Sequence, residues 1–220
     1  MTTPDAPAAG PTLHLTIELG TPDARHTKEQ TPAVRYTATH GGPSGTIRMD
    51  EAEPHIDAPD GSFALVEAEM ILSRVLDEQA WLAEIHRLLR PGGVLRATLP
   101  AAGALAWLDA HNIYRYVVDI TGRGRAPTAT LPTGWNRHYF EDELRRMVED
   151  AGFQVERIER TGMGLAEVPH LAGLVVGDFL LHHPRIEHVL HPRRRKLERV
   201  DRDVRLPGLG KILTLTAVRP

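Results

Sequence analysis

Four histidines lie close together near the C-terminal end of the chain: His182, His183, His188 and His191. Neutral imidazole is a common metal ligand, so this cluster raises the question of a metal site. Its spacing argues against one, because Pro184 interrupts the helix that would have to present the four side chains together. No His-Glu-x-x-His pair accompanies the cluster. The sequence therefore predicts no metal centre.

Residues for covalent or phosphate chemistry are also missing. The chain has no cysteine, which excludes disulfides, thiolate metal sites and cysteine nucleophiles. It has no Gly-x-Ser-x-Gly motif, and the Gly122–Arg125 loop does not follow a strand as a phosphate-binding loop should. A short basic run at 193–196 is either a solvated helix face or a contact for an anion or a partner. Hydrolase and nucleotidase functions are not supported.

Composition narrows the class of protein further. The 220 residues carry 26 basic and 29 acidic side chains, a net charge of -3, which gives no reason to expect nucleic-acid binding. No apolar stretch is long enough to span a membrane. The first twelve residues lack the basic and apolar regions of a signal peptide. We therefore expect a disordered leader over 1–11, one domain over 12–220, a cytoplasmic location and no membrane partner.

The first sixty residues are predicted to be strand and loop. Apolar and polar residues alternate over 13–19, a period of two that indicates a strand. The stretches 33–39 and 45–49 also look extended. The polar segment between the first two strands contains Gly20, Pro22 and Pro32 and is too broken to predict a normal helix.

The following stretch alternates between strands and helices. The dense apolar run 63–72 favours a buried parallel strand, although its second half could be helical. Asp77 resembles an N-cap, and the residues after it repeat apolar side chains every three or four positions. The Pro91-Gly92-Gly93 turn is predicted to stop this helix. A strand over 94–100 follows, which favours an α/β fold.

The remaining elements are predicted with varying clarity. Residues 101–135 favour a helix plus a mobile loop, and residues 141–152 form a clear amphipathic helix that ends at Gly152. A strand follows at 154–160. Helical stretches are expected over 165–183 and roughly 185–199, and a closing strand over 212–218.

Three segments resemble the second half of class I S-adenosylmethionine-dependent methyltransferases: 59–63 (PDGSF), 81–95 (WLAEIHRLLRPGGVL) and 137–159 (RHYFEDELRRMVEDAGFQVERIE). The N-terminal half is similar to the compact members of that family. The resemblance implies a Rossmann-like fold whose sheet is mostly parallel with a final antiparallel strand, and whose N-terminal half is reduced. It also implies a lid or insert near 101–135 and a helical insert near 165–200.

The resemblance implies S-adenosyl-L-methionine as cofactor, bound at the ends of strands one, two and four. The family's first loop brings backbone close to the cofactor, which glycine permits. Here that position includes Glu18 and has one glycine, Gly20. Asp50 or Glu51 would contact the adenine amino group, and Glu67 is a further candidate on the fourth strand.

Several positions depart from the family pattern. The second strand ends without the acidic residue that would hold the ribose hydroxyls, since it reads Thr39-His40-Gly41. Ala64 stands where the family has an aspartate, and Ser73-Arg74 where it has a Glu-His pair. Each departure removes a polar contact near the cofactor.

The acceptor side is implied by the same resemblance. His138 lies where family members place residues at the mouth of the acceptor site, and His111, Tyr114 and Tyr116 lie in the insert that would form the lid. These residues are candidates for general base or positioning roles. The alternative for His138 is a helix-start histidine that bonds to backbone, and for the two tyrosines it is packing.

Two functions follow from these expectations. The first is methyl transfer to a small-molecule or glycan-like acceptor, with a role in natural-product biosynthesis. The second is a pseudo-methyltransferase that does not bind the cofactor and acts as a partner subunit, or catalyses a cyclisation or isomerisation. Both are compatible with a homo- or hetero-oligomer, and a shared fold does not decide between them.

Overall fold

The structure is a computed structural model that describes residues 10–18, 33–39, 41–123, 134–180, 197, 200, 201, 204 and 209–220. The chain divides into two compact units. Unit 1 comprises Met1–Leu99, Glu141–Ile158 and Thr214–Pro220, and unit 2 comprises Pro100–Phe140 and Glu159–Leu213. Unit 2 contains the segments that the sequence predicted as a lid and a helical insert.

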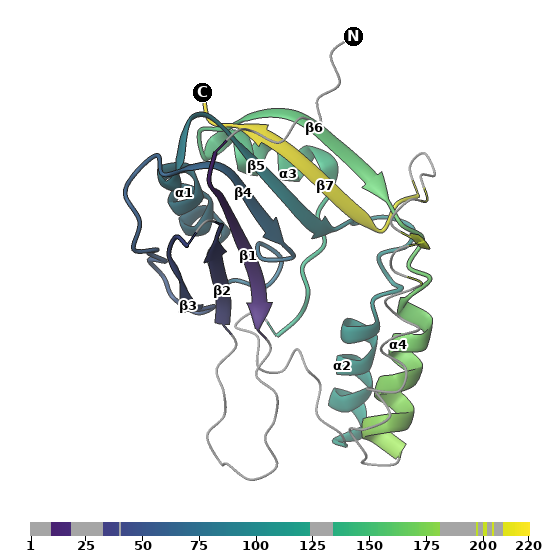
Figure 1. The fold of residues 1–220 in the computed structure, drawn as a ribbon. Helices are drawn as coiled ribbons and strands as arrows, with labels where there is room; N and C mark the ends of the chain where they lie inside the picture. Colours follow the sequence, from purple (N-terminus) through teal and green to yellow (C-terminus); the bar gives the residue numbers. More distant parts are fainter. Residues whose placement is uncertain are drawn as a thin grey trace. The chain divides into compact units, whose positions relative to one another are not determined.

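Seven strands form one sheet in the order β3-β2-β1-β4-β5-β7-β6 (Figure 1). They are β1 (Thr12–Glu18), β2 (Ala33–Ala38), β3 (Ser44–Arg48), β4 (Phe63–Glu69), β5 (Leu89–Pro100), β6 (Gln154–Thr161) and β7 (Ile212–Val218). The strands β1, β4 and β5 are parallel neighbours. The strand order reverses between β1 and β4, as it does in a doubly wound sheet. The predicted α/β, Rossmann-like fold is confirmed.

The N-terminal part of the sheet differs from the prediction of a mostly parallel sheet. The strand β2 is antiparallel to both β1 and β3, so the sheet is mixed. Parallel neighbours need a crossover across a face of the sheet. Here Glu18 and Ala33 are Cα partners, so the chain leaves β1 and enters β2 at the same edge. The carboxyl end of β2 consequently lies at the opposite edge, where Ala38 is the partner of Leu13.

The final strand is antiparallel to β5, as predicted. The Gly92 N–H donates to the Arg219 carbonyl at 2.8 Å near one end of the pair, and the Ala101 N–H donates to the Lys211 carbonyl at 2.7 Å near the other. Residue numbers therefore rise along β5 while those of its partner fall, which defines an antiparallel pairing.

The helix α1 (Glu78–Leu88) begins where the sequence predicted. The Asp77 side chain accepts a 3.0 Å hydrogen bond from the Ala80 N–H, so Asp77 is the N-cap. The helix ends at Leu88, before the predicted Pro-Gly-Gly stop, and β5 starts at Leu89 instead of residue 94. Leu89 is fully buried and pairs with Phe63, so tertiary pairing ends the helix early.

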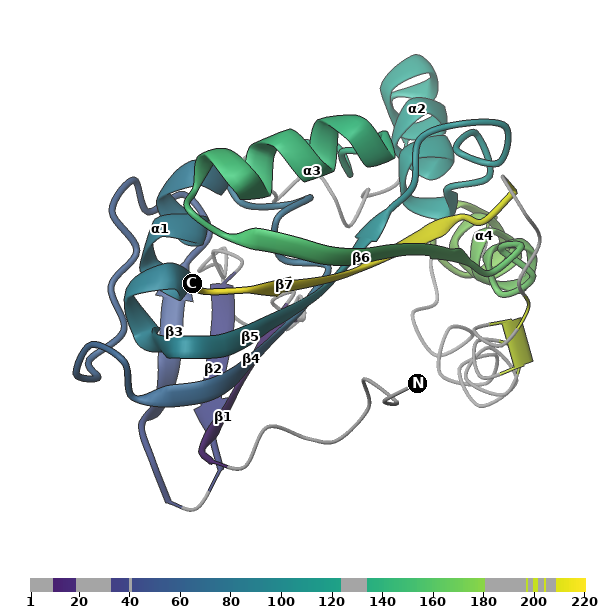
Figure 2. The same ribbon diagram turned by 90° about the horizontal axis from the view of Figure 1, so that it is seen from above.

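The core of unit 1 lies between the sheet and two helices, α1 and α3 (Glu141–Asp150), which cover the same face (Figure 2). Side chains that repeat at helical spacing fill it: Trp81, Leu82, Ile85 and Leu88 from α1, and Leu144 and Val148 from α3. Leu13, Leu15, Val66 and Leu95 contribute from the strands. The apolar positions that repeat at helical spacing in α1 and two of those in α3 are thus buried.

Unit 2 contains the helix α2 (Ala110–Thr121), the helix α4 (Glu167–Gly173) and a π-helical continuation, η2 (Leu174–Leu180). Ala110, Tyr114 and Leu174 form a buried cluster between these helices. Apart from residue 197, which is helical, the predicted helix near 185–199 lies outside the described residues, as do the basic run 193–196 and the four C-terminal histidines. Within the described ranges, no helix has the length and apolar character to cross a membrane.

Candidate functional site

Two groups of residues, one in each unit, could carry chemistry. In unit 1 the relevant place is the carboxyl edge of the sheet at the point where the strand order reverses, because ligands of open α/β sheets bind there. The strand β1 ends at Glu18 and β4 at Glu69 on this edge. The antiparallel register places Ala33 and Arg48 there as well. Asp50, two residues after β3, therefore lies at the predicted cofactor edge.

Asp50 is held by a neighbouring guanidinium. Arg48 donates from Nε to Oδ1 at 2.9 Å and from a terminal nitrogen to Oδ2 at 2.5 Å. The hydrogen bond from Arg48 lowers the pKa of Asp50 below its usual range, so this carboxylate stays charged. The next residue, Glu51, closes the turn by donating its N–H to the Arg48 carbonyl at 3.2 Å.

Met70 has an unusual backbone conformation at this edge. It follows β4 and has φ of 56°, a left-handed conformation that costs a non-glycine residue roughly 1–2 kcal/mol. Its N–H donates to the Thr98 carbonyl at 3.0 Å, and its carbonyl accepts from Ser73 Oγ at 3.1 Å. Such strain persists where surrounding bonds fix it, and it is often found at binding sites. The buried Thr98 Oγ1 has no hydrogen-bond partner among the described residues.

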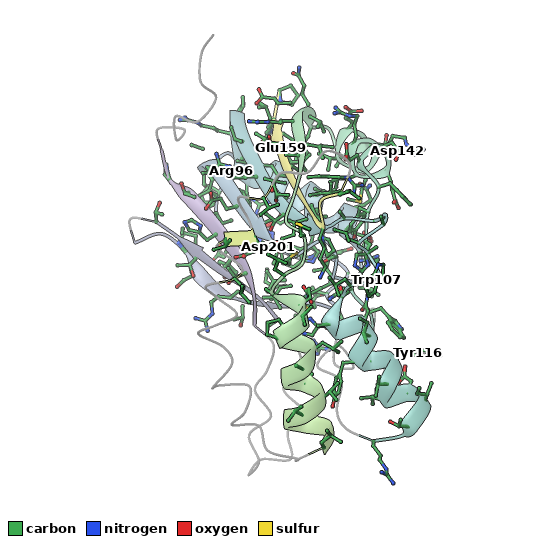
Figure 3. All side chains as sticks on the ribbon, turned by 90° about the vertical axis from the view of Figure 1, so that its right-hand side faces the viewer. Arg96, Trp107, Tyr116, Asp142, Glu159 and Asp201 are labelled. Carbon is green, nitrogen blue, oxygen red and sulfur yellow. The ribbon has the colours of Figure 1, made fainter. Side chains whose placement is uncertain are left out.

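Of the other predicted cofactor residues, Glu67 does not lie at this edge. Glu67 lies within β4 on the face of the sheet, where it pairs with His14 at 2.9 Å and Arg96 at 3.2 Å. Figure 3 labels Arg96 on that part of the sheet. The backbone of Glu18 ends β1, its side chain is outside the description, and Gly20 lies outside the described residues. Their roles in cofactor binding stay predictions.

In unit 2 the candidate site is a buried polar cluster at the start of α2. Asp109 is the N-cap of this helix and accepts a 3.0 Å hydrogen bond from the Asn112 N–H. Both of its oxygens also accept from the Asn136 amide, at 3.2 and 3.4 Å. The Nε2 atom of His138 lies 3.3 Å from Asp109 Oδ2. One carboxylate thus brings together a backbone N–H of α2 and two side chains from a second segment of unit 2.

A pair of asparagines fixes the position of this cluster. The Asn112 amide donates to the Asn136 carbonyl at 3.0 Å, and the Asn136 N–H donates to Asn112 Oδ1 at 2.9 Å. After these residues the chain is hydrogen-bonded to the end of β5, since the Tyr139 N–H donates to the Pro100 carbonyl at 3.0 Å. His138 is therefore held between two anchored neighbours, with its side chain 15% exposed.

The charges around Asp109 keep it ionised. Burial alone would raise its pKa, but the adjacent His138 imidazole, the hydrogen bond from the Asn112 N–H and the charges of Lys211 and His111 outweigh burial. The pKa of Asp109 therefore lies well below its usual range. Lys211 is itself buried and forms an ion pair with Glu167.

His111 and Tyr114 have different surroundings from His138. His111 makes an edge-to-face contact with His170, with ring centroids 4.6 Å apart. Tyr114 has no exposed surface and lies in the apolar cluster with Leu174. Full burial in an apolar cluster favours a packing role for Tyr114 over the predicted catalytic role. His111 contributes charge near Asp109, so of the two it is closer to the polar cluster.

The arrangement of His138 and Asp109 suits proton transfer. A carboxylate beside one imidazole nitrogen orients the neutral ring, which leaves the other nitrogen to accept a proton. Among the described residues, no group of three or more histidine, aspartate or glutamate side chains could hold a metal ion. The cluster is therefore a candidate general base with its positioning residues.

We expect the ionised Asp109 to make stability depend on pH. A carboxylate whose pKa is lowered on folding stabilises the protein above its unfolded pKa of about 4, and this contribution is lost as the pH falls further. Urea denaturation of the Asp109→Asn variant should show a loss on the order of 2 kcal/mol at pH 7 relative to the wild type, and a smaller loss near pH 3. An equal loss at both pH values would contradict this account.

The sequence pointed to part of this cluster. His138 was selected through the family resemblance, whereas Asp109 and Asn136 were not selected. An aspartate directly before an amphipathic stretch is an N-cap signal, which could have identified Asp109. Lys211 could not have been found in this way, because no local pattern indicates a buried lysine that pairs with a residue 44 positions earlier.

A comparison with family models gives one match, a model described as a methyltransferase domain, over residues 18–158. No curated protein sequence matches the chain.

Solved structures similar to this chain include the [4+2]-cyclase SpnF, at 19% identity over 75% of this chain and 52% of that chain, with a TM-score of 0.41. An S-adenosylmethionine-dependent methyltransferase from Mesorhizobium loti is 17% identical over 79% and 67%, with a TM-score of 0.40. The 1,6-didemethyltoxoflavin-N1-methyltransferase of Burkholderia thailandensis is 16% identical over 74% and 46%, with a TM-score of 0.38. The chain thus spans about half to two thirds of the length of these structures.

Proposed function

The chain belongs to the methyltransferase domain family, and from this membership we propose that it is an S-adenosylmethionine-dependent methyltransferase acting on a small-molecule or glycan-like acceptor. The observation that carries the proposal is the buried pair of His138 and Asp109, which is arranged for proton removal. Methyl transfer to a hydroxyl or amine needs an oriented acceptor and, for a neutral nucleophile, a base.

The residues at the carboxyl edge of unit 1 fit the cofactor in chemical type. Its ribose hydroxyls and amino groups need hydrogen-bond acceptors, and the edge offers the carboxylates of Asp50 and Glu69. The unpartnered Thr98 hydroxyl and the strained Met70 backbone are further contacts there. When bound, S-adenosylmethionine supplies an electrophilic methyl group on a sulfonium. Because β2 is reversed, the family's usual ribose position at the end of that strand lies at the other edge, so Asp50 takes over that role.

His138 performs the proton transfer in this proposal. The proton of the acceptor hydroxyl or amine passes to Nδ1, since Nε2 faces the carboxylate of Asp109. Asp109 stays charged because its pKa is lowered, so it stabilises the imidazolium that forms. The acceptor heteroatom would then take the methyl group that the bound cofactor supplies. Asn136 and Asn112 act as positioning residues by holding Asp109.

A second candidate function is favoured by the reversed β2. In the doubly wound fold the first crossover helix presents its N-terminus to the cofactor. The antiparallel pairing of β1 with β2 does not need a crossover. A protein of this family that does not bind the cofactor could act as a partner subunit, or use the His138 pair for a cyclisation or isomerisation.

Titration calorimetry with S-adenosylmethionine separates the two functions. We expect measurable heat and a rise in melting temperature, since a ligand that binds the folded state stabilises it by mass action.

Asp50→Ala should weaken binding by about tenfold or more, through loss of a charged hydrogen bond. Glu53→Ala removes an exposed carboxylate from the same loop and is the matched control. No heat and no thermal shift at millimolar ligand would contradict the methyltransferase proposal and leave the second candidate.

A further inference from the structure

Exposed apolar side chains are concentrated in unit 2. In the described part of the chain, the exposed large apolar residue of unit 1 is Leu76, whereas the other twelve belong to unit 2: Trp107, Tyr116, Ile120, Trp135, Phe140, Met163, Leu165, Val168, Val176, Leu180, Val200 and Leu209. Single exposed apolar side chains need no explanation, but a concentration of them marks an interaction surface.

Two of these groups form stripes along helices. On α2, Tyr116 and Ile120 are 60% and 64% exposed, and the half-buried Ile113 and Val117 extend the same stripe at helical spacing. Figure 3 shows Tyr116 projecting outward from α2.

The second stripe runs along α4 and η2. Val168, Val176 and Leu180 are exposed at intervals that are multiples of four, with Ala172 exposed between the first two. Residues four apart lie on one side of a helix, so this is a continuous apolar stripe.

The two stripes lie on the same side of the helix pair. The helices run in the same direction, since Ala110 at the start of α2 donates its N–H to Glu167 at the start of α4. On α2, Ile113 and Val117 stand one position before the packed residues Tyr114 and Val118. On α4 and η2, Ala172 and Val176 stand one position after the packed residues Leu171 and Val175. Successive residues of a helix are rotated by about 100° around its axis. In two parallel helices, the position before the packed residue on one helix and the position after the packed residue on the other therefore face the same side of the pair.

We propose that this apolar surface, formed by Ile113, Tyr116, Val117 and Ile120 with Val168, Ala172, Val176 and Leu180, is where a second copy of the chain packs. Four large side chains of this surface, Tyr116, Ile120, Val168 and Leu180, are more than half exposed, and such a projecting surface suits a macromolecular partner. These four expose on the order of 100 Å² each, and with the smaller contributions of the other members the surface comes near the roughly 800 Å² that one partner contributes to a standard interface.

The choice of a second copy over other partners rests on complementarity. Unit 1 offers Leu76 as its exposed large apolar residue in the described part, so it provides no matching apolar surface. Among the described residues, unit 2 carries the other exposed large apolar side chains, so the matching surface lies on unit 2 of another copy. Contact through the same surface of both copies gives a two-fold arrangement, the commonest kind in oligomers. Two helix pairs that meet in this way form a four-helix packing.

A membrane surface is a poorer match. Interfacial helices carry basic side chains beside the apolar face. On these helices the described charges are already compensated, since Arg115 bonds to Asp119 at 2.9 Å and Glu167 pairs with Lys211. The proposal does not rest on the proposed methyltransferase function, because packing between copies requires neither cofactor nor acceptor.

Sedimentation equilibrium of the full chain at micromolar concentration tests this proposal. We expect a dimer for the wild type and a dimer weakened on the order of 100-fold for the double variant Ile120→Glu/Val168→Glu, because it replaces a highly exposed apolar side chain of each stripe by a charge that the contact would bury. Leu76→Glu places the same charge on an equally exposed side chain of unit 1 and should leave the dimer unchanged. Circular dichroism confirms that the variants are folded.

Three outcomes would overturn the proposal. The wild type could be a monomer throughout the concentration range, or it could form a dimer that the double variant does not weaken. A monomer that floats with vesicles of phosphatidylcholine and phosphatidylglycerol, and loses this property in the double variant, would assign the surface to a membrane instead.

Discussion

Arg87→Ala is expected to lower the free energy of unfolding by about 3–5 kcal/mol, because it leaves a buried carboxylate without its partner. Arg87 donates to both oxygens of Glu84 at 2.7 Å. It also donates to the carbonyls of Ile56 and Ala58, at 3.0 and 2.9 Å, and so fixes the segment that follows β3. Glu84 is 7% exposed. Burial alone would raise its pKa, but the hydrogen bonds and charge of Arg87 outweigh burial and lower it.

Urea denaturation at pH 7 measures this loss. Arg145→Ala is the matched control, because it removes an exposed arginine that pairs with Glu149 four residues away, and such pairs contribute about 0.3–0.5 kcal/mol. Adding Glu84→Gln to Arg87→Ala should recover part of the stability, since the unpaired charge is then gone. A loss for Arg87→Ala as small as that of the control would show that Glu84 is not held in this way.

His138→Ala is expected to lower the rate of methyl transfer by about 10²–10⁴-fold, the range that removal of a general base produces. The Nε2 atom of this residue lies 3.3 Å from a carboxylate oxygen of Asp109, which stays ionised and orients the ring. Formation of S-adenosylhomocysteine is the readout, with the acceptor that reacts fastest in a screen of phenols and amines. Added imidazole should restore part of the rate, which a purely structural loss would not allow.

His55→Ala is the control for this experiment, because His55 is an exposed histidine of unit 1 that takes no part in the polar cluster. Its rate should equal that of the wild type. An unchanged rate for His138→Ala would discard the proposed base and leave Asp109 as a helix cap alone. A lowered rate without imidazole rescue would assign His138 a positioning role.

The local elements could be predicted from the sequence. The Asp77 N-cap, the apolar stripe of α1 and the strand starting at Phe63 depend on residues close together in the chain, and the structure has them where they were expected. The Pro91-Gly92-Gly93 segment was predicted to stop the helix, but it lies within β5. A Cβ on Gly93 would lie 2.8 Å from the Arg90 carbonyl, so this glycine permits close backbone packing at the start of β5 instead of ending a helix.

The direction of β2 could not be predicted, because alternating side chains indicate a strand and not its orientation. The family resemblance favoured parallel pairing. The return of the chain from Glu18 to Ala33 at one edge was visible only in the structure. The same limit applies to the pairing of Asp109 with His138, which brings together residues 29 positions apart.

The apolar surface of unit 2 shows why exposure is hard to predict. The amphipathic pattern of α2 contains both a packed stripe, with Tyr114 and Val118, and an exposed one, with Tyr116 and Ile120. Apolar residues on two sides of a helix are typical of a helix that is buried on both sides. In the structure one of the two sides remains open, which led to the proposed contact between copies.

The central claim is that a nucleoside cofactor binds at the carboxyl edge of unit 1. Hydrogen–deuterium exchange with and without S-adenosylmethionine tests it most directly, because bound ligand slows exchange of the amides that it contacts or orders. We expect slower exchange over residues 48–51, after β3, and over residues 69–73, after β4. Unchanged exchange at both segments with saturating ligand, or slowing confined to residues 38–44 at the opposite edge, would contradict the claim.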